Sequence, residues 1–152
     1  MERVRQRIES APVRRGTGTI ASKAPAGVDL MFRAFADRTR LRILQLLQHG
    51  PLCVGDLVAI LRAPQPTVSR HLGYLRRSGF VEPRQHGLWM FYELAPAQNA
   101  LHSKLLACLT VCARLLPQAK ADLGYARSVR RSGGCCPEGH RLMQQRQHGR
   151  DR

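Results

Sequence analysis

Pro64-Gln65-Pro66-Thr67-Val68-Ser69-Arg70-His71-Leu72-Gly73-Tyr74-Leu75-Arg76-Arg77-Ser78-Gly79 is the stretch that decides the fold. Val68, Leu72 and Leu75 recur at helical spacing, which predicts one helix with an apolar inner face. We expect Pro66 at the first helical position, because a proline there costs no backbone hydrogen bond. The polar side chains between the apolar ones form an outer face rich in hydrogen-bonding groups, which suits a helix lying in a DNA groove.

A second short helix is predicted directly before this stretch, over residues 53–61. Its apolar face comes from Leu57, Val58, Ile60 and Leu61, and residues 62–65 connect the two helices. Two short helices joined by so tight a turn match the helix-turn-helix plan, in which the second helix enters the major groove. An ordinary helical hairpin has the same topology, and the polar outer face of residues 64–79 favours the DNA-binding interpretation.

A β-hairpin is predicted directly after the stretch, because the hydrophobic period changes to two. Its strands are expected at 80–84 and 88–94, around a turn at 85–87. A hairpin in this place forms a wing, and Pro83 predicts an edge strand because proline cannot donate to a ladder. Arg84 and His86 near the tip are candidates for phosphate or minor-groove contact, with solvated turn residues as the alternative.

Helices are also predicted on both sides of this core. They are expected at residues 28–35, 38–48 with Asp37 as cap, 96–116, and 118–129. The helix at 96–116 carries an apolar seam of the kind that pairs helices, made of Leu101, Leu105, Cys108, Cys112 and Leu115. The predicted fold class is therefore mainly α with a small β-hairpin (α+β), a winged helix-turn-helix that forms a homodimer through its terminal helices.

The charge of the chain indicates a polyanionic partner. It has 25 Lys and Arg against 10 Asp and Glu, a net charge of +15, and double-stranded DNA is the partner that this charge and the predicted helix favour together. A membrane partner is not expected, because no apolar run approaches the roughly 20 residues of a spanning helix. We divide the chain into a mobile basic arm (1–26), a DNA-binding and dimerisation domain (27–129) and a basic, cysteine-containing tail (130–152).

The N-terminal region is arginine-rich and lacks the apolar core of a secretory signal, so a cytoplasmic location is expected. The five cysteines should then be reduced thiols, and an odd number with one adjacent pair suits a metal or redox site better than a disulfide framework.

Three segments together carry the pattern of one known family. They are Phe35-Ala36-Asp37-Arg38-Thr39-Arg40-Leu41-Arg42-Ile43-Leu44, Leu52-Cys53-Val54-Gly55-Asp56-Leu57, and Gln65-Pro66-Thr67-Val68-Ser69-Arg70-His71-Leu72. They closely resemble the arsenical-resistance repressor (ArsR) family. The resemblance covers roughly residues 28–116 in order, spacing and residue type. It implies a homodimer that sits on operator DNA as a repressor and leaves it when a thiophilic ion binds cysteines. Many members carry Cys-Val-Cys at the start of the third helix. Because Gly55 replaces the second of these cysteines, any ion must find its other ligands elsewhere.

Our first choice of ligands is Cys53, Cys135 and Cys136. A soft, three-coordinate ion such as As(III) or Sb(III) prefers thiolates, so its site should bring about three sulfurs together. Cys135 and Cys136 are adjacent on a glycine-rich segment that can fold inward, and Cys53 begins the helix before the DNA-reading one.

Cys108 and Cys112 are the second choice. They are one helical turn apart and share a face, but thiols in an apolar seam also act as small hydrophobes. A mixed site of this pair with the tail cysteines stays open. His102 and His140 would suit Zn(II) or Cd(II), although neither has a typical ligand spacing.

The candidate DNA contacts share an exposed polar position on the predicted reading helix or wing. They are Gln65, Thr67, Ser69, Arg70, His71, Arg76, Arg77, Arg84 and His86. A thiol-redox repressor, in which Cys135 or Cys136 is oxidised, and a Cd-, Pb- or Zn-responsive repressor are the alternatives. We expect no enzyme and no organic cofactor, because the sequence shows no cofactor loop and no nucleophile with a plausible base.

Overall fold

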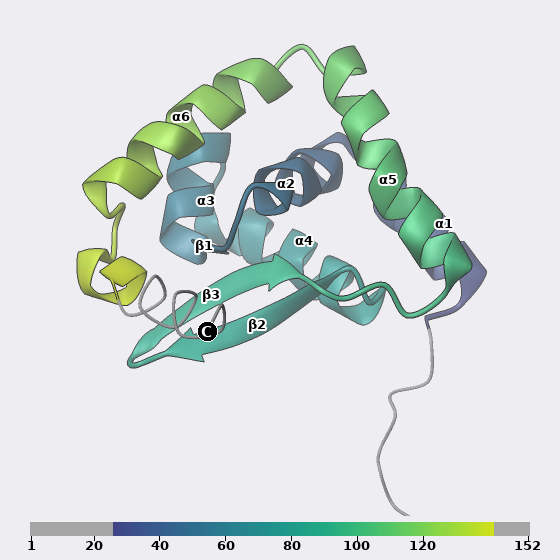
Figure 1. Cartoon of the computed structure of the whole chain (residues 1–152), viewed down its shortest axis with the longest axis horizontal. Helices are drawn as coiled ribbons and strands as arrows, with labels where there is room; N and C mark the ends of the chain where they lie inside the picture. The colour runs from purple at the N-terminus through teal and green to yellow at the C-terminus, as the bar shows by residue number, and fades with distance from the viewer. Residues whose placement is uncertain (1–25, 142–152) are drawn as a thin grey trace, which may run out of the picture.

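The computed structural model describes residues 26–141, in which the helices pack together and a small antiparallel sheet lies along one side of them (Figure 1). The elements follow in the order α1 (Val28–Phe35), α2 (Arg38–Gln48), β1 (Leu52–Cys53), α3 (Val54–Leu61), α4 (Gln65–Arg77), β2 (Val81–His86), β3 (Trp89–Leu94), α5 (Ala100–Leu115) and α6 (Ala119–Ser132). A short helical segment at 137–141 follows α6. The predicted arm at 1–26 lies outside the described residues except for its last position.

Helix α2 lies at the centre of the helical layer and carries much of the core. Asp37 caps it as predicted, with its side chain accepting a hydrogen bond from the Arg40 N–H at 2.9 Å. Four apolar residues of α2 are buried: Ile43, Leu44, Leu46 and Leu47. The inner residues of the neighbouring segments are buried against them: Leu57, Leu72, Leu75 and Phe80. Burial on this scale fixes the positions of α3 and α4 against α2.

Helices α3 and α4 form the predicted helix-turn-helix. Arg62 adopts a left-handed conformation (φ 53°) and ends α3, and Pro64 precedes α4. Pro66 therefore occupies the second helical position, so the predicted start was wrong by one residue. Val68, Leu72 and Leu75 are buried as predicted. The polar face of α4 is consequently left on the surface.

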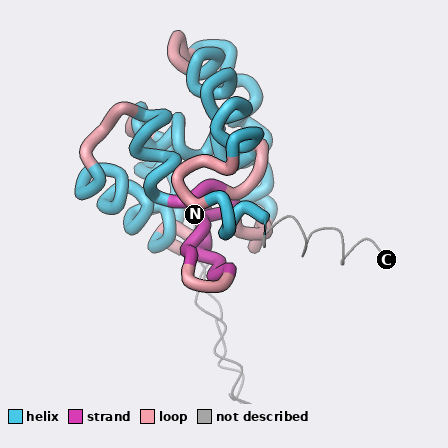
Figure 2. The backbone as a smooth tube through the Cα atoms, turned by 90° about the vertical axis from the view of Figure 1, so that its left-hand side faces the viewer, coloured by secondary structure: helices cyan, strands magenta, loops and turns pink. Residues whose placement is uncertain are grey.

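The wing is part of a three-stranded sheet with strand order β1-β3-β2. The predicted turn at 85–87 is wrong, because Gln85 pairs with Met90 and His86 pairs with Trp89 inside the ladder. The turn is instead Gly87-Leu88, with Gly87 at a positive φ of 61°. Pro83 lies on edge strand β2 as predicted. Figure 2 shows the hairpin projecting from the helical body.

Strand β1 was not predicted, because two residues are too few to show a period. Leu52 pairs with Tyr92 and Cys53 pairs with Phe91. This short strand fixes Cys53, the residue directly before α3, to the middle of the wing strand β3.

Helices α5 and α6 close the other side of α2. Helix α5 begins at Ala100 rather than at Pro96, because the Asn99 side chain caps it by accepting from the His102 N–H at 2.8 Å. Arg42 of α2 donates two hydrogen bonds to Asp122 of α6, at 2.6 and 2.8 Å, which anchors α6 on the domain. Within residues 26–141 no single helix has the length and apolar composition to cross a membrane. Only α5 and α6 taken together do, and they are bent by 106°.

Candidate metal centre

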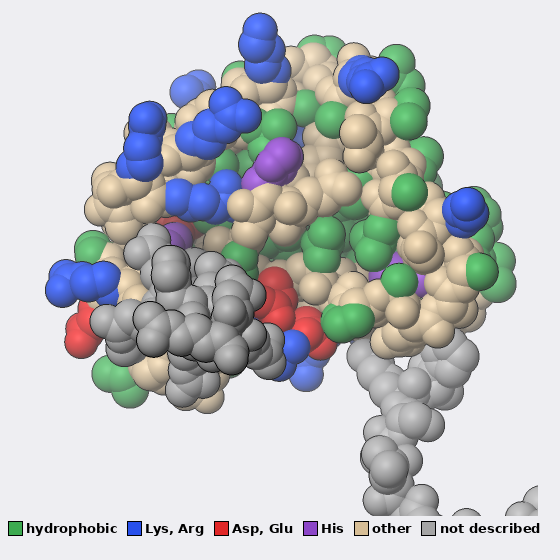
Figure 3. Space-filling view, viewed as in Figure 1, with side chains coloured by type: hydrophobic (Ala, Val, Ile, Leu, Met, Phe, Trp, Pro, Cys, Tyr) green, Lys and Arg blue, Asp and Glu red, His purple; other side chains and the backbone are tan. Residues whose placement is uncertain are grey.

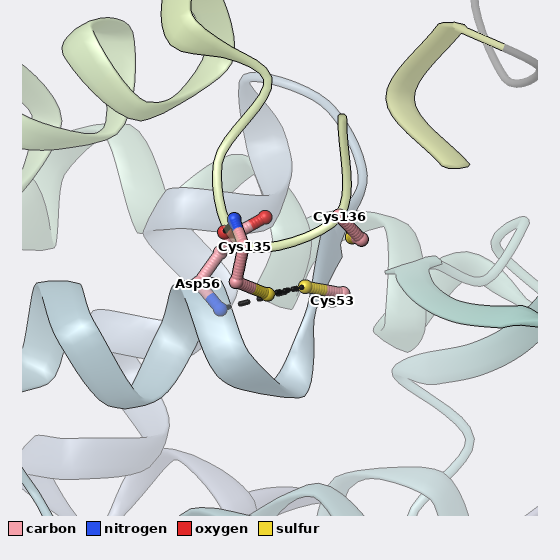
Figure 4. A group of neighbouring side chains, drawn as sticks. All are labelled: Cys53, Asp56, Cys135 and Cys136. Atoms are coloured by element: carbon pink, nitrogen blue, oxygen red, sulfur yellow. Dashed lines mark hydrogen bonds between the residues drawn. The ribbon is translucent and has the colours of Figure 1, made fainter. Parts of the chain in front are cut away.

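Cys53, Asp56, Cys135 and Cys136 converge at the start of α3 (Figure 4). One candidate ligand atom from each residue lies within 4.8 Å of the others. The structure thus brings together the three cysteines of the first-choice set, from segments about eighty residues apart. Asp56 was missed by the sequence analysis, although it follows Cys53 by three residues, the spacing of a helix cap and its third helical position.

Cys53 is held in place by both elements that it joins. It ends β1, paired with Phe91, and it is the N-cap of α3, where its Sγ accepts a hydrogen bond from the Asp56 N–H at 3.4 Å. The side chain is buried. A sulfur in this position faces the amino end of a helix, which favours negative charge.

The segment after α6 is turned inward by two glycines with positive φ, Gly133 (81°) and Gly134 (56°). A Cβ at Gly134 would overlap the Asp56 carboxylate, so only glycine permits this approach. The Cys135 N–H donates to Asp56 Oδ1 at 2.9 Å, and His140 Nε2 lies 2.8 Å from Asp56 Oδ2. Both carboxylate oxygens are therefore engaged in holding the cysteine segment.

Gly55 creates the space that Cys135 fills. A Cβ built at Gly55 would lie 2.5 Å from Cys135 Sγ and 3.9 Å from Cys53 Sγ. The glycine that replaces the second cysteine of the Cys-Val-Cys pattern thus admits a sulfur from the tail to the same place, where Cys53 Sγ and Cys135 Sγ are 3.0 Å apart.

Burial is the largest influence on the pKa values of Cys53 and Cys136. It raises the pKa of Cys53, and the hydrogen bond with Cys135 raises it further. Burial also raises the pKa of Cys136 to about 11. For Asp56, burial opposes ionisation, but the hydrogen bonds from the Cys135 N–H and from His140 outweigh it and lower the pKa. The site therefore combines a carboxylate that favours its charged form with two thiols, Cys53 and Cys136, that favour their protonated form.

The second-choice cysteines form a separate pair. Cys108 Sγ and Cys112 Sγ are 3.9 Å apart on α5, and neither belongs to the group around Cys53. His102 is buried against Phe80, with ring centroids 4.6 Å apart, and its Nδ1 accepts from the Gln98 N–H. His102 therefore serves the core, whereas His140 lies beside the thiols and contacts them through Asp56.

The predicted DNA contacts occupy two regions of the surface. Gln65, Ser69, Arg70, Arg76 and Arg77 are exposed on α4, and Thr67 and His71 are half-buried. On the wing, the Arg84 guanidinium lies between Glu93 and Glu82, 2.6 and 2.5 Å away. The ring of His86 packs on Phe91 at 5.6 Å. Wing residues Arg84 and His86 are thus engaged within the wing itself, and the DNA contacts stay predictions.

Residues 37–82 match the family model of bacterial regulatory proteins of the arsR family. An uncharacterized HTH-type transcriptional regulator of Methanocaldococcus jannaschii is 48% identical over 63 residues, which cover 41% of this chain and 71% of the relative. The chain belongs to the ArsR family. This confirms the resemblance and, with the helix-turn-helix and hairpin described above, the winged helix-turn-helix fold.

Other ArsR relatives differ in the ion that their names mention. The arsenical resistance operon repressor of Escherichia coli is 44% identical over 77 residues, covering 50% of this chain and 66% of the relative. A cadmium resistance regulatory protein CadC homolog of Staphylococcus aureus is 33% identical over 88 residues, covering 57% and 73%. Membership of the ArsR family therefore indicates transcription regulation and leaves the effector to be argued from the site.

Among solved structures, reduced HlyU from Vibrio cholerae superposes with a TM-score of 0.50 and 32% identity, covering 59% of this chain and 88% of that one. The segment with Cys135 and Cys136 follows α6, well beyond the matched residues 37–82. The part of the site contributed by the tail is therefore known from this chain's own geometry.

Proposed function

We propose that the protein is a cytoplasmic repressor that leaves its operator when As(III) or Sb(III) binds Cys53, Cys135 and Cys136. The observation that carries this proposal is the convergence of three sulfurs at the amino end of α3, the helix directly before the reading helix α4. Its membership of the ArsR family supports the DNA-binding half of the proposal.

The donor set suits a soft, three-coordinate element. Both oxygens of Asp56 are engaged by the Cys135 N–H and by His140, which leaves three sulfurs as free donors. Arsenous acid, As(OH)₃, exchanges its three hydroxyls with three thiols, forming three As–S bonds and releasing three waters. The exchange takes one proton from each thiol, and thiophilic elements prefer the resulting sulfur ligands.

The position of the site offers a route to the DNA. Cys53 caps α3, and residues Arg62–Pro64 join α3 to α4. An ion that links the tail cysteines to Cys53 would therefore shift the first helix of the helix-turn-helix. If the ion favours a geometry that the operator does not, linkage requires the operator to weaken ion binding by the same factor. A differential affinity of a few kcal/mol is sufficient for release.

The operator-bound form in this proposal is a homodimer. Helices α1 and α5 carry large apolar residues with high exposed fractions: Val28 (58%), Phe32 (53%), Val111 (57%) and Leu115 (77%). Such a face is typical of a surface that another subunit covers. Figure 3 shows hydrophobic side chains along α5 at the right and Lys and Arg over α6 at the upper left. A second copy on α1 and α5 would cover the apolar face and set two α4 helices about 34–36 Å apart, one turn of DNA.

The experiment is a titration of the protein on its own promoter DNA, followed by fluorescence anisotropy at fixed salt. Arsenite and antimonite are expected to release the DNA from the wild type. Cys53→Ser, Cys135→Ser and Cys136→Ser should each abolish release, whereas the matched control Cys108→Ser should respond fully. Full response by Cys53→Ser, or no release of the wild type by either compound, overturns the proposal.

A thiol-redox repressor is the second candidate, favoured by the 3.0 Å contact of Cys53 Sγ with Cys135 Sγ. Two thiols and one peroxide would give a disulfide and two waters. Intact mass spectrometry separates the two, because an arsenic adduct that has lost three protons supports the first and a loss of two protons without adduct supports the second. Adding Cd(II), Pb(II) and Zn(II) to the same titration tests a repressor of divalent ions.

A further inference from the structure

The segment 133–141 contacts both the first helix of the helix-turn-helix, α3, and the wing strand β3. On one side it is held by Asp56 of α3, through the Cys135 N–H and the His140 ring, both at hydrogen-bond distance. On the other side it lies on the wing strand β3. Asp56 and His140 are both almost completely buried, so the contact is shielded from water.

The wing side of the contact is close-packed. A Cβ built at Gly139 would lie 2.7 Å from Trp89 Cδ1 and Cγ, so the tryptophan ring packs directly on the glycine backbone. The ring of His140 packs edge-on against Phe91, with centroids 5.0 Å apart. Cys136 is buried in one small cluster with Cys53 and Phe91. Trp89 and Phe91 are two residues apart and share one face of β3.

We propose that residues 133–141 couple the thiol site to the wing, with His140 and Trp89 as the positioning residues of that link. This inference rests on the proposed function, because it concerns how the same site acts on DNA. Ion binding can also act on α4 through α3, as described under the proposed function. In the present proposal the tail moves the β2–β3 hairpin.

Covalent geometry makes the link short and stiff. Cys136 and Gly139 are three residues apart, about one helical turn, so a shift of the Cys136 sulfur moves the Gly139 backbone on which the Trp89 ring packs. Close-packed contacts transmit such a shift because there is no empty space between the groups into which one of them could move. When one ion bonds to all three sulfurs, the sulfurs of Cys135 and Cys136 shift relative to that of Cys53. The contacts of Gly139 and His140 with β3 pass this shift on to the wing.

The test uses Gly139→Ala, whose added methyl group cannot fit under the Trp89 ring. Gly124→Ala on α6 is the matched control, since a Cβ there meets nothing within 4 Å. Trp89 is the only tryptophan in the chain, so its emission reports on the contact directly. Antimonite is the probe, added to the full-length protein while the emission and the number of bound antimony atoms per chain are measured.

Wild type and Gly124→Ala are expected to change Trp89 emission when antimonite binds. Gly139→Ala should bind the same amount with little change in emission. In the anisotropy titration, the ratio of operator Kd with and without antimonite should fall by about tenfold or more in Gly139→Ala, within the usual range of coupling factors. The operator Kd without antimonite should stay close to that of the wild type.

A second variant guards against misfolding of the segment. Trp89→Ala removes the contact without adding bulk and should lower the same ratio, whereas Met90→Ala, on the opposite face of β3, should not. If Gly139→Ala and Trp89→Ala release DNA as the wild type does, the coupling proposal is wrong and the proposed function stands. If the wild type itself binds antimonite without releasing DNA, the proposed function is wrong and the coupling proposal falls with it.

Discussion

The two groups of cysteines in this chain differ in what holds their sulfurs together. Cys108 and Cys112 are neighbours because they are one turn apart on α5, and their sulfurs are 3.9 Å apart at a partly exposed surface. Cys53 meets Cys135 and Cys136 because a buried carboxylate and two missing Cβ atoms bring distant segments together. Sequence spacing alone explains the first group. The second group depends on residues that are not cysteines, namely Gly55, Gly134 and Asp56.

The largest effect is expected from removing the carboxylate that assembles the second group. Asp56→Ala leaves the Cys135 N–H and His140 without their acceptor, in a buried place, and should lower the free energy of unfolding by about 3 kcal/mol. The tail should also detach, so arsenite no longer releases the operator. Chemical denaturation and the anisotropy titration measure the two effects. Asp122→Ala, which breaks the Arg42 contact away from the thiols, is the control for stability alone. A full arsenite response in Asp56→Ala would contradict this role.

A smaller effect is expected when all five thiols are kept and only the space that Cys135 Sγ occupies beside Gly55 is filled. Gly55→Ala places a methyl group where Cys135 Sγ lies, so that sulfur must leave the site. Arsenite affinity should fall by roughly 10–100-fold, as changes next to a ligand set commonly do. Gly124→Ala provides the comparison, and equal affinities for the two variants would show that Cys135 is not a ligand.

The smallest effect is expected at the α5 pair. Cys112→Ala removes a thiol that is only half-buried, so the free energy of unfolding should change by less than about 1 kcal/mol. Release by arsenite should be unchanged. Loss of release in this variant would make the α5 pair a ligand group and reverse the comparison.

Most of the fold could be predicted from the sequence, because its elements carry strong local patterns. The burial of Val68, Leu72 and Leu75 and the cap at Asp37 follow from helical periodicity and capping chemistry. The errors occur where the pattern is short or shared. Strand β1 has two residues, and the hairpin turn depends on Gly87 taking a positive φ rather than on the residues before it.

The sequence predicted the three cysteines of the candidate site but not the residues that hold them in place, Asp56 and His140. The adjacent pair Cys135-Cys136 and the missing second cysteine at Gly55 both pointed to a ligand set that spans the chain. The role of Asp56 and His140 could not be read from sequence, because a carboxylate in a helix's first turn is usually a capping residue at the surface. Only the tertiary contact of α3 with the tail shows that these two side chains meet.

The order of the ligands along the chain has a consequence for synthesis. A ribosome completes the reading head, α3, α4 and the wing, before residues 135 and 136 are made. If the proposed ligand set is right, a product that stops after Ser132 would keep α6 and the reading helix while lacking two of the three thiols. In the proposed mechanism, such a fragment would stay on the operator in the presence of arsenite. If the repressor is the proposed homodimer, the fragment would also pair with complete chains and keep the genes silent in a cell that makes both.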